Sequence, residues 1–244
     1  MNIIRCDPQR NAKTIILDSI EKHGIVLLQG APLSGKTTVI EQLTYSLNSR
    51  SSSASMIRSC NIDLYSSLNH AVVQAFGLPH WVASAADQVF FSALRELVAK
   101  KPMVLLIDDI DVFFGGVRYS EACSYISSLY RYIGAIKIIG SFYNSTNVTR
   151  LVTNLFPEKP LITELASMQL NDDFRKFVCD VAHRHGLRKY QVKDEAFVGR
   201  LYQKTAGASG SVIQSIALMA RTGLLVNGRV ASVDLLANFW MERS

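Results

Sequence analysis

The residues best suited to chemistry in this 244-residue chain lie in one short stretch, residues 30–37. They read Gly-Ala-Pro-Leu-Ser-Gly-Lys-Thr, which fits the phosphate-binding pattern G-x-x-x-x-G-K-[ST]. Backbone N–H groups of such a loop surround phosphate oxygens, the lysine ammonium adds a positive charge, and the threonine hydroxyl ligates Mg²⁺. The stretch predicts a nucleotide site, with contacts expected from Gly30, Ala31, Pro32, Leu33, Ser34, Gly35, Lys36, Thr37 and Thr38.

The segments on either side of this loop match the context that phosphate binding needs. Residues 24–29 form an apolar run typical of a buried strand. Residues 38–47 have helical spacing, with Val39, Leu43 and Leu47 on one side. A helix that begins at the loop directs the positive end of its dipole at the phosphates, which favours nucleotide binding.

A second stretch, residues 103–111, joins an apolar run directly to three acids. This pattern predicts a strand buried on both faces, with carboxylates at its C-terminal end. Ligands of open α/β sheets bind at that edge. Asp108 is expected to bind Mg²⁺ together with Thr37, and Asp109 to orient or deprotonate the water that attacks the γ-phosphate.

Small polar residues follow the next expected strand, residues 135–140. Ser141 lies just past the expected end of that strand, and Asn144 lies three residues further on. A side chain at this place can reach the γ-phosphate or its water, so both residues are candidates for the catalytic site.

Up to about residue 165, strand-like segments alternate with helical ones, which predicts an α/β fold with a parallel, doubly wound sheet. The inward faces are predicted from apolar spacing: Ile15, Ile16 and Ile20 in the helix at 7–22, and Val89, Phe90, Leu94 and Val98 in the helix at 85–100. From residue 166 only helices are expected, including one capped by Asn171. The predicted domains are therefore a nucleotide-binding domain over residues 1–165 and a small helical lid over residues 166–244. Expected strands are 24–29, 54–59, 103–108, 135–140 and 161–165, and expected helices include 7–22, 64–76, 85–100, 119–132, 146–155 and 233–241.

Composition limits the remaining classes. The chain is 48% hydrophobic and 19% charged, so it can form a real core and is not disordered as a whole. Four widely separated cysteines lack metal-ligand spacing and are expected to be reduced thiols, and no apolar run approaches the length of a membrane span. A cytoplasmic protein is expected, and the net charge of +6 is compatible with a nucleic-acid partner.

The order of these motifs resembles the AAA+ ATPases. Within them, the chain looks most like the transposon target-selection ATPases, the TniB/TnsC group related to MuB. Three further stretches carry this resemblance. Residues 138–141 (Ile-Ile-Gly-Ser) resemble the end of the sensor strand, residues 165–177 the entry into the lid, and residues 205–213 the start of the sensor-two helix.

The resemblance implies an ATPase that assembles on duplex DNA as a ring or helical filament and recruits or activates a transposase at the target. A target-selector protein is a further implied partner. A neighbouring protomer would supply an arginine to the ATP site, with Arg150 favoured over Arg131 and Arg118. DNA contacts, made to the backbone with little sequence preference, would come from Arg50, Arg58, Ser59 and Asn61.

The chain departs from the AAA+ pattern in three ways. Asp109 stands where AAA+ members usually carry glutamate, which implies hydrolysis that is slow or stimulated by DNA or a partner. The turn at residues 211–214 lacks the usual sensor-two arginine or lysine. We also expect the chain to work without the longer terminal extensions of larger members.

Three other functions stay open at this point. A STAND-type signalling NTPase often has two aspartates after the strand but carries long repeat or effector regions. A replication helicase loader or initiator is also a DNA-associated AAA+ protein. A scaffold that binds ATP without hydrolysing it differs from the first interpretation in whether Asp109 is active.

Overall fold

The structure is a computed structural model of the chain and describes residues 6–49, 53–58, 66–114, 119–133, 136–143, 159–187 and 194–221. These residues form two compact units with separate cores. The α/β unit comprises residues 11–31 and 36–165, and the helical unit comprises residues 6–10, 32–35 and those from 166 on. Within the described residues, no helix has the length and apolarity needed to cross a membrane.

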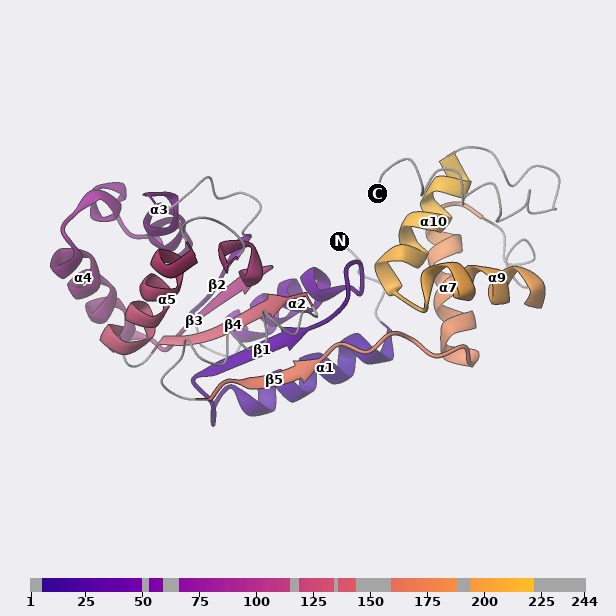
Figure 1. The fold of residues 1–244 in the computed structure, drawn as a ribbon, viewed down its shortest axis with the longest axis horizontal. Coiled ribbons are helices and arrows are strands. Elements are labelled where there is room, and N and C mark those ends of the chain that lie inside the picture. The colour runs from indigo at the N-terminus through magenta and orange to yellow at the C-terminus, as the bar shows by residue number, and fades with distance from the viewer. Residues whose placement is uncertain are drawn as a thin grey trace. The chain divides into compact units, whose positions relative to one another are not determined.

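The described elements follow one another largely as the sequence predicts (Figure 1). In chain order they are α1 (Asp7–Ser19), β1 (Ile25–Gln29), α2 (Lys36–Asn48), β2 (Ser53–Arg58), α3 (Ser66–Ala75), η2 (His80–Ser84), α4 (Asp87–Lys100), β3 (Met103–Asp108), η3 (Ile110–Phe114), α5 (Tyr119–Ile133), β4 (Ile136–Phe142), β5 (Leu161–Glu164), α7 (Asp172–Arg184), α9 (Glu195–Thr205) and α10 (Ser209–Arg221). The expected helices at 146–155 and 233–241 lie outside the described residues.

Five parallel strands form one sheet in the order β2-β3-β4-β1-β5. Because the strands are parallel, their carboxyl ends lie at one edge. The order places β4 between β1 and β3, so the loop after β1 and the acids after β3 flank the end of β4. This edge is where open α/β sheets bind ligands.

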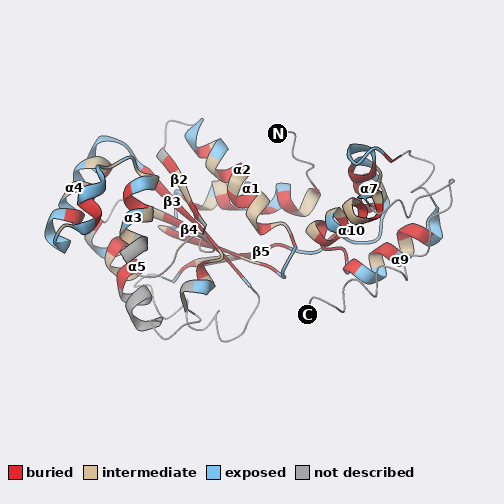
Figure 2. Cartoon of the chain, turned by 90° about the horizontal axis from the view of Figure 1, so that it is seen from above, coloured by how far each residue is buried: buried red, intermediate tan, exposed pale blue. Residues whose placement is uncertain are grey.

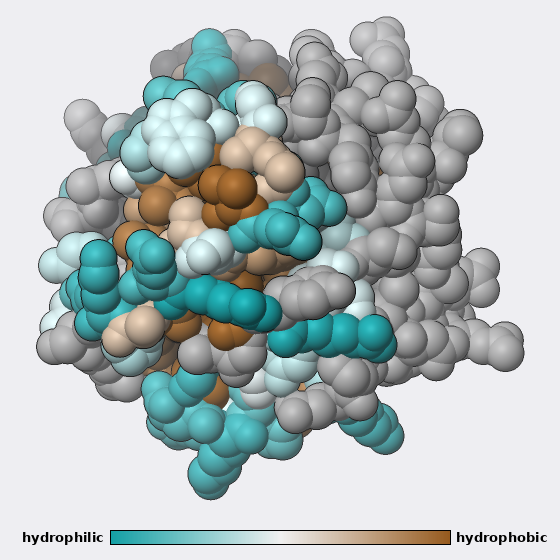
Figure 3. Space-filling model, turned by 90° about the vertical axis from the view of Figure 1, so that its left-hand side faces the viewer, coloured by the Kyte–Doolittle hydropathy of each residue, from teal (hydrophilic) through white to brown (hydrophobic). Residues whose placement is uncertain are grey.

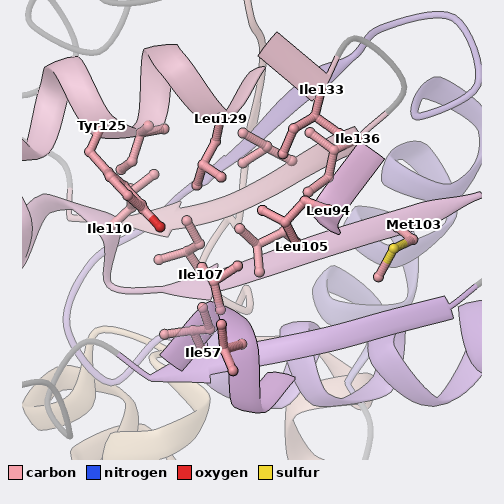
Figure 4. Packing of buried hydrophobic residues seen from close by; sticks show 14 of the residues in the cluster. Ile57, Leu94, Met103, Leu105, Ile107, Ile110, Tyr125, Leu129, Ile133 and Ile136 are labelled. Atoms are coloured by element: carbon pink, nitrogen blue, oxygen red, sulfur yellow. The ribbon is translucent and has the colours of Figure 1, made fainter. Parts of the chain in front are cut away.

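Both faces of the sheet are covered, as Figure 2 shows by the buried strands between the helices. Along β3, Met103, Leu105 and Ile107 pack with α3, α4 and α5, whereas Val104 and Leu106 pack with α1 and α2. Figure 4 shows the first of these cores at close range. Successive side chains of a strand point to opposite faces, so a strand buried on both sides is apolar at every position.

The helical unit has its own core, built from one apolar side of each described helix. Asn171 caps α7 by accepting a hydrogen bond from the Phe174 N–H, as the sequence predicts. Asp194 caps α9 in the same way through the Ala196 N–H. The core residues from the three helices include Phe174, Phe177, Val178, Val181, Phe197, Val198, Leu201, Val212, Ile216 and Met219.

Two of the predicted inward positions are wrong. Ile15 is 47% exposed and Val89 is 45% exposed. The other predicted inward residues, Ile16, Ile20, Phe90, Leu94 and Val98, are buried as expected. Neighbouring helical residues lie about 100° apart around the axis, so Ile15 and Val89 fall beside the buried sides rather than within them. At the end of the α/β unit that carries α3, α4 and α5, Figure 3 shows an apolar surface area framed by hydrophilic side chains. Trp81 on η2, 65% exposed, is another large apolar side chain at the surface.

Alanine substitutions on α4 test its observed orientation. Leu94 is fully buried, so Leu94→Ala should lower the free energy of unfolding by about 2–5 kcal/mol. Val89→Ala, the matched control on the same helix, should change it by about 0.5 kcal/mol or less. Denaturant unfolding of both variants measures the difference, and equal losses would contradict this orientation of α4.

Candidate nucleotide site

The loop between β1 and α2 turns sharply at the carboxyl edge of the sheet. Leu33 and Gly35 adopt positive φ angles of 58° and 99°. The Gly30 N–H donates to the Phe142 carbonyl at 3.1 Å, which joins the start of the loop to the end of β4. Ser34 is buried, and its hydroxyl has no hydrogen-bond partner in the described part of the chain. Left-handed residues alternating with right-handed ones along a loop make a concave backbone surface suited to anions.

Lys36 lies at the first position of α2 and is buried. Its ammonium donates to the carbonyls of Gly30 at 3.0 Å and Ala31 at 3.1 Å, so the side chain folds back against its own loop. An ammonium has three N–H donors, and two of them satisfy these carbonyls. The third can donate to a phosphate oxygen while the side chain keeps this orientation.

The carboxylate of Asp108 is the centre of the site. One oxygen accepts a hydrogen bond from the Thr37 hydroxyl at 2.7 Å, and the other accepts one from the Ser141 hydroxyl at 2.6 Å. Asp108 is 5% exposed and Ser141 is completely buried. The two bonds fix the carboxylate in one orientation beside the first turn of α2. A buried carboxylate needs such donors to offset the loss of water.

Thr37 and Asp108 together suit a magnesium ion. Mg²⁺ prefers oxygen ligands and usually takes one or two from the protein, while phosphate oxygens and water supply the rest. A hydroxyl and a carboxylate oxygen 2.7 Å apart fit that requirement. Among the described residues, no group of three or more His, Cys, Asp or Glu side chains could hold a metal. Thr37 and Asp108 would supply two oxygens to a Mg²⁺ ion whose other ligands come from phosphate and water.

Asp109 follows β3 in a left-handed conformation with φ of 53°. Its N–H donates to the Ser141 hydroxyl oxygen at 2.9 Å, so Ser141 contacts both acids. Burial raises the pKa of Asp109 most, and the neighbouring Asp108 raises it further, while Lys36 lowers it and Asp111 raises it. A raised pKa makes the ionised carboxylate a stronger base, which suits the role predicted for Asp109.

Ser141 is more enclosed than the sequence suggests. It lies inside β4 rather than past its end, because β4 continues to Phe142. Its hydroxyl hydrogen is directed at Asp108, and its oxygen accepts from the Asp109 N–H. Direct contact of Ser141 with a γ-phosphate stays a prediction, and the geometry adds the orientation of both acids as a second role.

The loops after β3 and β4 are also joined by Asp111. Its carboxylate accepts a hydrogen bond from the Tyr143 N–H at 2.9 Å. The bond holds the start of η3 beside the end of β4, next to Asp109. Asp111 belongs to the acidic run of the sequence. Its partner Tyr143 could not be predicted from that run, because the contact depends on β3 and β4 being neighbours in the sheet.

The other candidate residues stay predictions. Arg58 ends β2, with its backbone in register with Asp108 of β3. Arg131 is exposed in the last turn of α5. The candidates outside the described residues are Arg50, Ser59, Asn61, Arg118, Asn144 and Arg150.

Two further residues contact the loop without having been predicted as site residues, Gln9 and Ser209. Gln9 lies in the first turn of α1, and Ser209 is the first residue of α10. A Cβ added at Gly35 would lie 2.1 Å from Gln9 Nε2 and 2.7 Å from Ser209 Oγ. Gln9 belongs to no recognisable motif, and the stretch 205–213 that contains Ser209 predicts the start of a helix but not a contact with the loop, so only the fold indicates these contacts.

Known structures share this fold, although no protein-family model and no curated protein matches the sequence. A Walker-type ATPase of Pyrococcus abyssi gives a TM-score of 0.65 and 13% identity, with 88% of this chain and 68% of that chain covered. The ADP form of the ORC2 protein of Aeropyrum pernix gives a TM-score of 0.65 and 14% identity, with 98% of this chain and 68% of that chain covered. AMPPCP-bound DnaA from Aquifex aeolicus gives a TM-score of 0.57 and 16% identity, with 91% of this chain and 64% of that chain covered.

These likenesses confirm the predicted fold class, an α/β fold with a parallel, doubly wound sheet followed by helices. The chain spans about two thirds of the length of the chains it resembles. At 13–16% identity the likeness concerns the fold. The activity of this chain has to be inferred from its own site.

Replacing Asp109 with Asn tests the cost of its charge. Because its pKa is raised in the folded chain, the free energy of unfolding falls as pH rises from the ordinary value of 3.8 through the raised pKa. Above that window the wild type carries the full cost of the charged form. Asn avoids this cost and also tolerates a left-handed backbone.

We expect Asp109→Asn to have a higher Tm than the wild type at about pH 7, with the difference shrinking toward about pH 4. Thermal denaturation over this pH range measures the trend. A variant that is less stable than the wild type at every pH would contradict the assigned electrostatic environment.

Proposed function

We propose that the chain is an ATP-dependent, DNA-binding AAA+ regulator of transposition, related to the TniB/TnsC group. In this proposal, residues 1–165 bind the nucleotide and residues 166–244 form a helical lid. The observation that carries the ATPase part is the hydrogen-bonded set of Thr37, Asp108 and Ser141 beside the loop that carries Lys36. Binding and hydrolysis of ATP require a lysine at the phosphates and side-chain oxygens that hold Mg²⁺, and this set supplies both.

Each side chain has a proposed task in hydrolysis. Lys36 and the loop N–H groups bind the β- and γ-phosphates, and Thr37 and Asp108 would hold Mg²⁺. When bound, the metal neutralises charge on the phosphate oxygens. Asp109 orients the attacking water and accepts its proton, and Ser141 fixes the positions of Asp108 and Asp109.

Asp109 is one methylene shorter than the glutamate usual in AAA+ proteins, so its reach depends on its backbone. The hydrogen bond from its N–H to Ser141 and the left-handed φ of 53° determine where its carboxylate begins. We therefore propose a slow basal rate that rises when DNA or a neighbouring protomer completes the site. Arg150 is the first candidate for an arginine supplied in trans, with Arg131 and Arg118 as alternatives.

DNA binding and assembly form the second part of the proposal. A solved ORC1 protein of Aeropyrum pernix is in complex with DNA, and a DnaA initiator is bound to single-stranded DNA. Together with the net charge of +6, these fold relatives support a nucleic-acid partner. We propose duplex DNA, contacted through its backbone by Arg50, Arg58, Ser59 and Asn61, with a transposase and a target selector as protein partners of the assembled oligomer.

A replication initiator or helicase loader is the second candidate function. The likeness to the replication initiator DnaA and to a DNA replication initiation factor favours it, because both share this fold. The two candidates share the ATP site. They differ in how the protein assembles on DNA and in whether it prefers particular sequences.

Negative-stain microscopy of the full chain with duplex DNA of arbitrary sequence tests the assembly. Rings or filaments that require both DNA and ATP, or a non-hydrolysable analogue, are the expected result for a transposition regulator. Binding confined to particular DNA sequences would favour an initiator. Particles that stay monomeric with every combination of ligands would contradict the proposed assembly and leave the ATP site to be tested alone.

Lys36→Ala tests the ATP site directly. Charged hydrogen bonds contribute about 1.5–3 kcal/mol, so ATP affinity should fall by at least roughly tenfold and turnover should be lost. Lys137→Ala is a matched control, because Lys137 lies in β4, outside the loop, and is ion-paired with Glu21, which follows α1. Titration with a fluorescent ATP analogue measures both variants. Unchanged affinity in Lys36→Ala would overturn the loop assignment.

A further inference from the structure

Residues from the two ends of the helical unit contact the apex of the phosphate-binding loop, residues 32–35. The Gln9 side-chain amide donates to the Ser209 hydroxyl oxygen at 3.1 Å. The Ser209 hydroxyl in turn donates to the Ser34 carbonyl at 2.7 Å. Gln9, Ser209 and Ser34 are 2%, 2% and 4% exposed, so water does not compete for these bonds.

A second contact from α10 reaches the preceding carbonyl of the loop. The Gly210 N–H donates to the Leu33 carbonyl at 2.7 Å. The first N–H groups of a helix have no partner within the helix, so this donor is free to bind the loop. Gly210 also permits the close approach, because an added Cβ would lie 2.6 Å from the Leu33 carbonyl oxygen.

These contacts fix the orientation of two consecutive peptide groups. In a planar trans peptide, the N–H points away from the C=O. The carbonyls of Leu33 and Ser34 face α10, so the N–H groups of Ser34 and Gly35 face away from it. They are the N–H groups at the apex of the loop, just before Lys36.

We propose that Ser209 and Gln9 are positioning residues for nucleotide binding. They hold the apex carbonyls toward α10, and this preorganises the apex N–H groups for the phosphates. The inference rests on the proposed ATP site and assigns α10 a role there through neutral groups, in a segment that lacks a basic residue at 211–214. Ser209 acts on the loop directly, and Gln9 acts through Ser209.

The energetic effect follows from preorganisation. When a loop samples several conformations, the apparent affinity falls with the fraction that is competent to bind. Ser209→Ala leaves the Ser34 carbonyl without its donor and the Gln9 amide without its acceptor. A lost bond of this kind should weaken ATP and ADP binding by roughly 5- to 30-fold.

The matched control is another buried serine on the same helix. The Ser215 hydroxyl donates to the Ser211 carbonyl at 2.7 Å, one turn earlier in α10. Ser215 is 3% exposed, so Ser215→Ala removes a comparable buried hydroxyl without touching the loop. If α10 mattered only for folding, the two substitutions would have similar effects on nucleotide binding.

The test measures ATP and ADP affinity, KM and kcat in the full chain, together with Tm in nucleotide-free buffer. Ser209→Ala is expected to weaken both nucleotides and raise KM with little change in kcat, whereas Ser215→Ala should keep wild-type affinity. Gln9→Ala should weaken binding in the same direction by a smaller factor. It also tests the inference if Ser209→Ala does not fold.

Two outcomes would overturn the inference. Wild-type affinity in Ser209→Ala, or in Gln9→Ala where Ser209→Ala is not folded, would show that these bonds do not prepare the loop. Equal weakening in Ser215→Ala would reduce the effect to helix stability. If the wild type binds neither ATP nor ADP, the proposed function fails and this inference fails with it.

Discussion

The site depends on a buried carboxylate that must be satisfied without water. Asp108 is the last residue of β3, and all the residues before it in that strand are apolar and buried. Its charge is therefore costly unless donors surround it. Thr37 provides one donor from the helix that follows the phosphate-binding loop, and Ser141 provides the other from the neighbouring strand. These two bonds therefore tie three separate parts of the chain to one point at the edge of the sheet.

Several features of the site follow from this constraint. Ser141 can hold Asp108 only because β4 lies between β1 and β3, and its hydroxyl oxygen then accepts the N–H of Asp109. That bond supports a left-handed residue directly after the strand, which directs the second acid differently from the first. Its raised pKa arises mainly from burial and from the neighbouring Asp108 carboxylate. Orientation and basicity of the second acid are thus linked to the same cluster.

The sequence predicted the parts whose signal is local. The glycine and lysine pattern of the loop, the apolar run before Asp108 and the cap at Asn171 each specify a structure within a few residues. Helix faces were harder, because at Val89 the apolar pattern leaves two neighbouring positions as candidates for burial, and packing selects the other. The contacts of Gln9 and Ser209 could not be predicted, since they join residues 200 positions apart through common polar side chains.

We infer that Thr37 and Asp108 form a magnesium-dependent nucleotide site with the loop. The most direct test compares ATP affinity with Mg²⁺ and with a chelator, in the wild type and in Asp108→Asn. We predict tighter binding with Mg²⁺ in the wild type and loss of most of this gain in the variant, because an amide replaces the carboxylate ligand. An equal gain from Mg²⁺ in both proteins, or none in the wild type, would contradict the account.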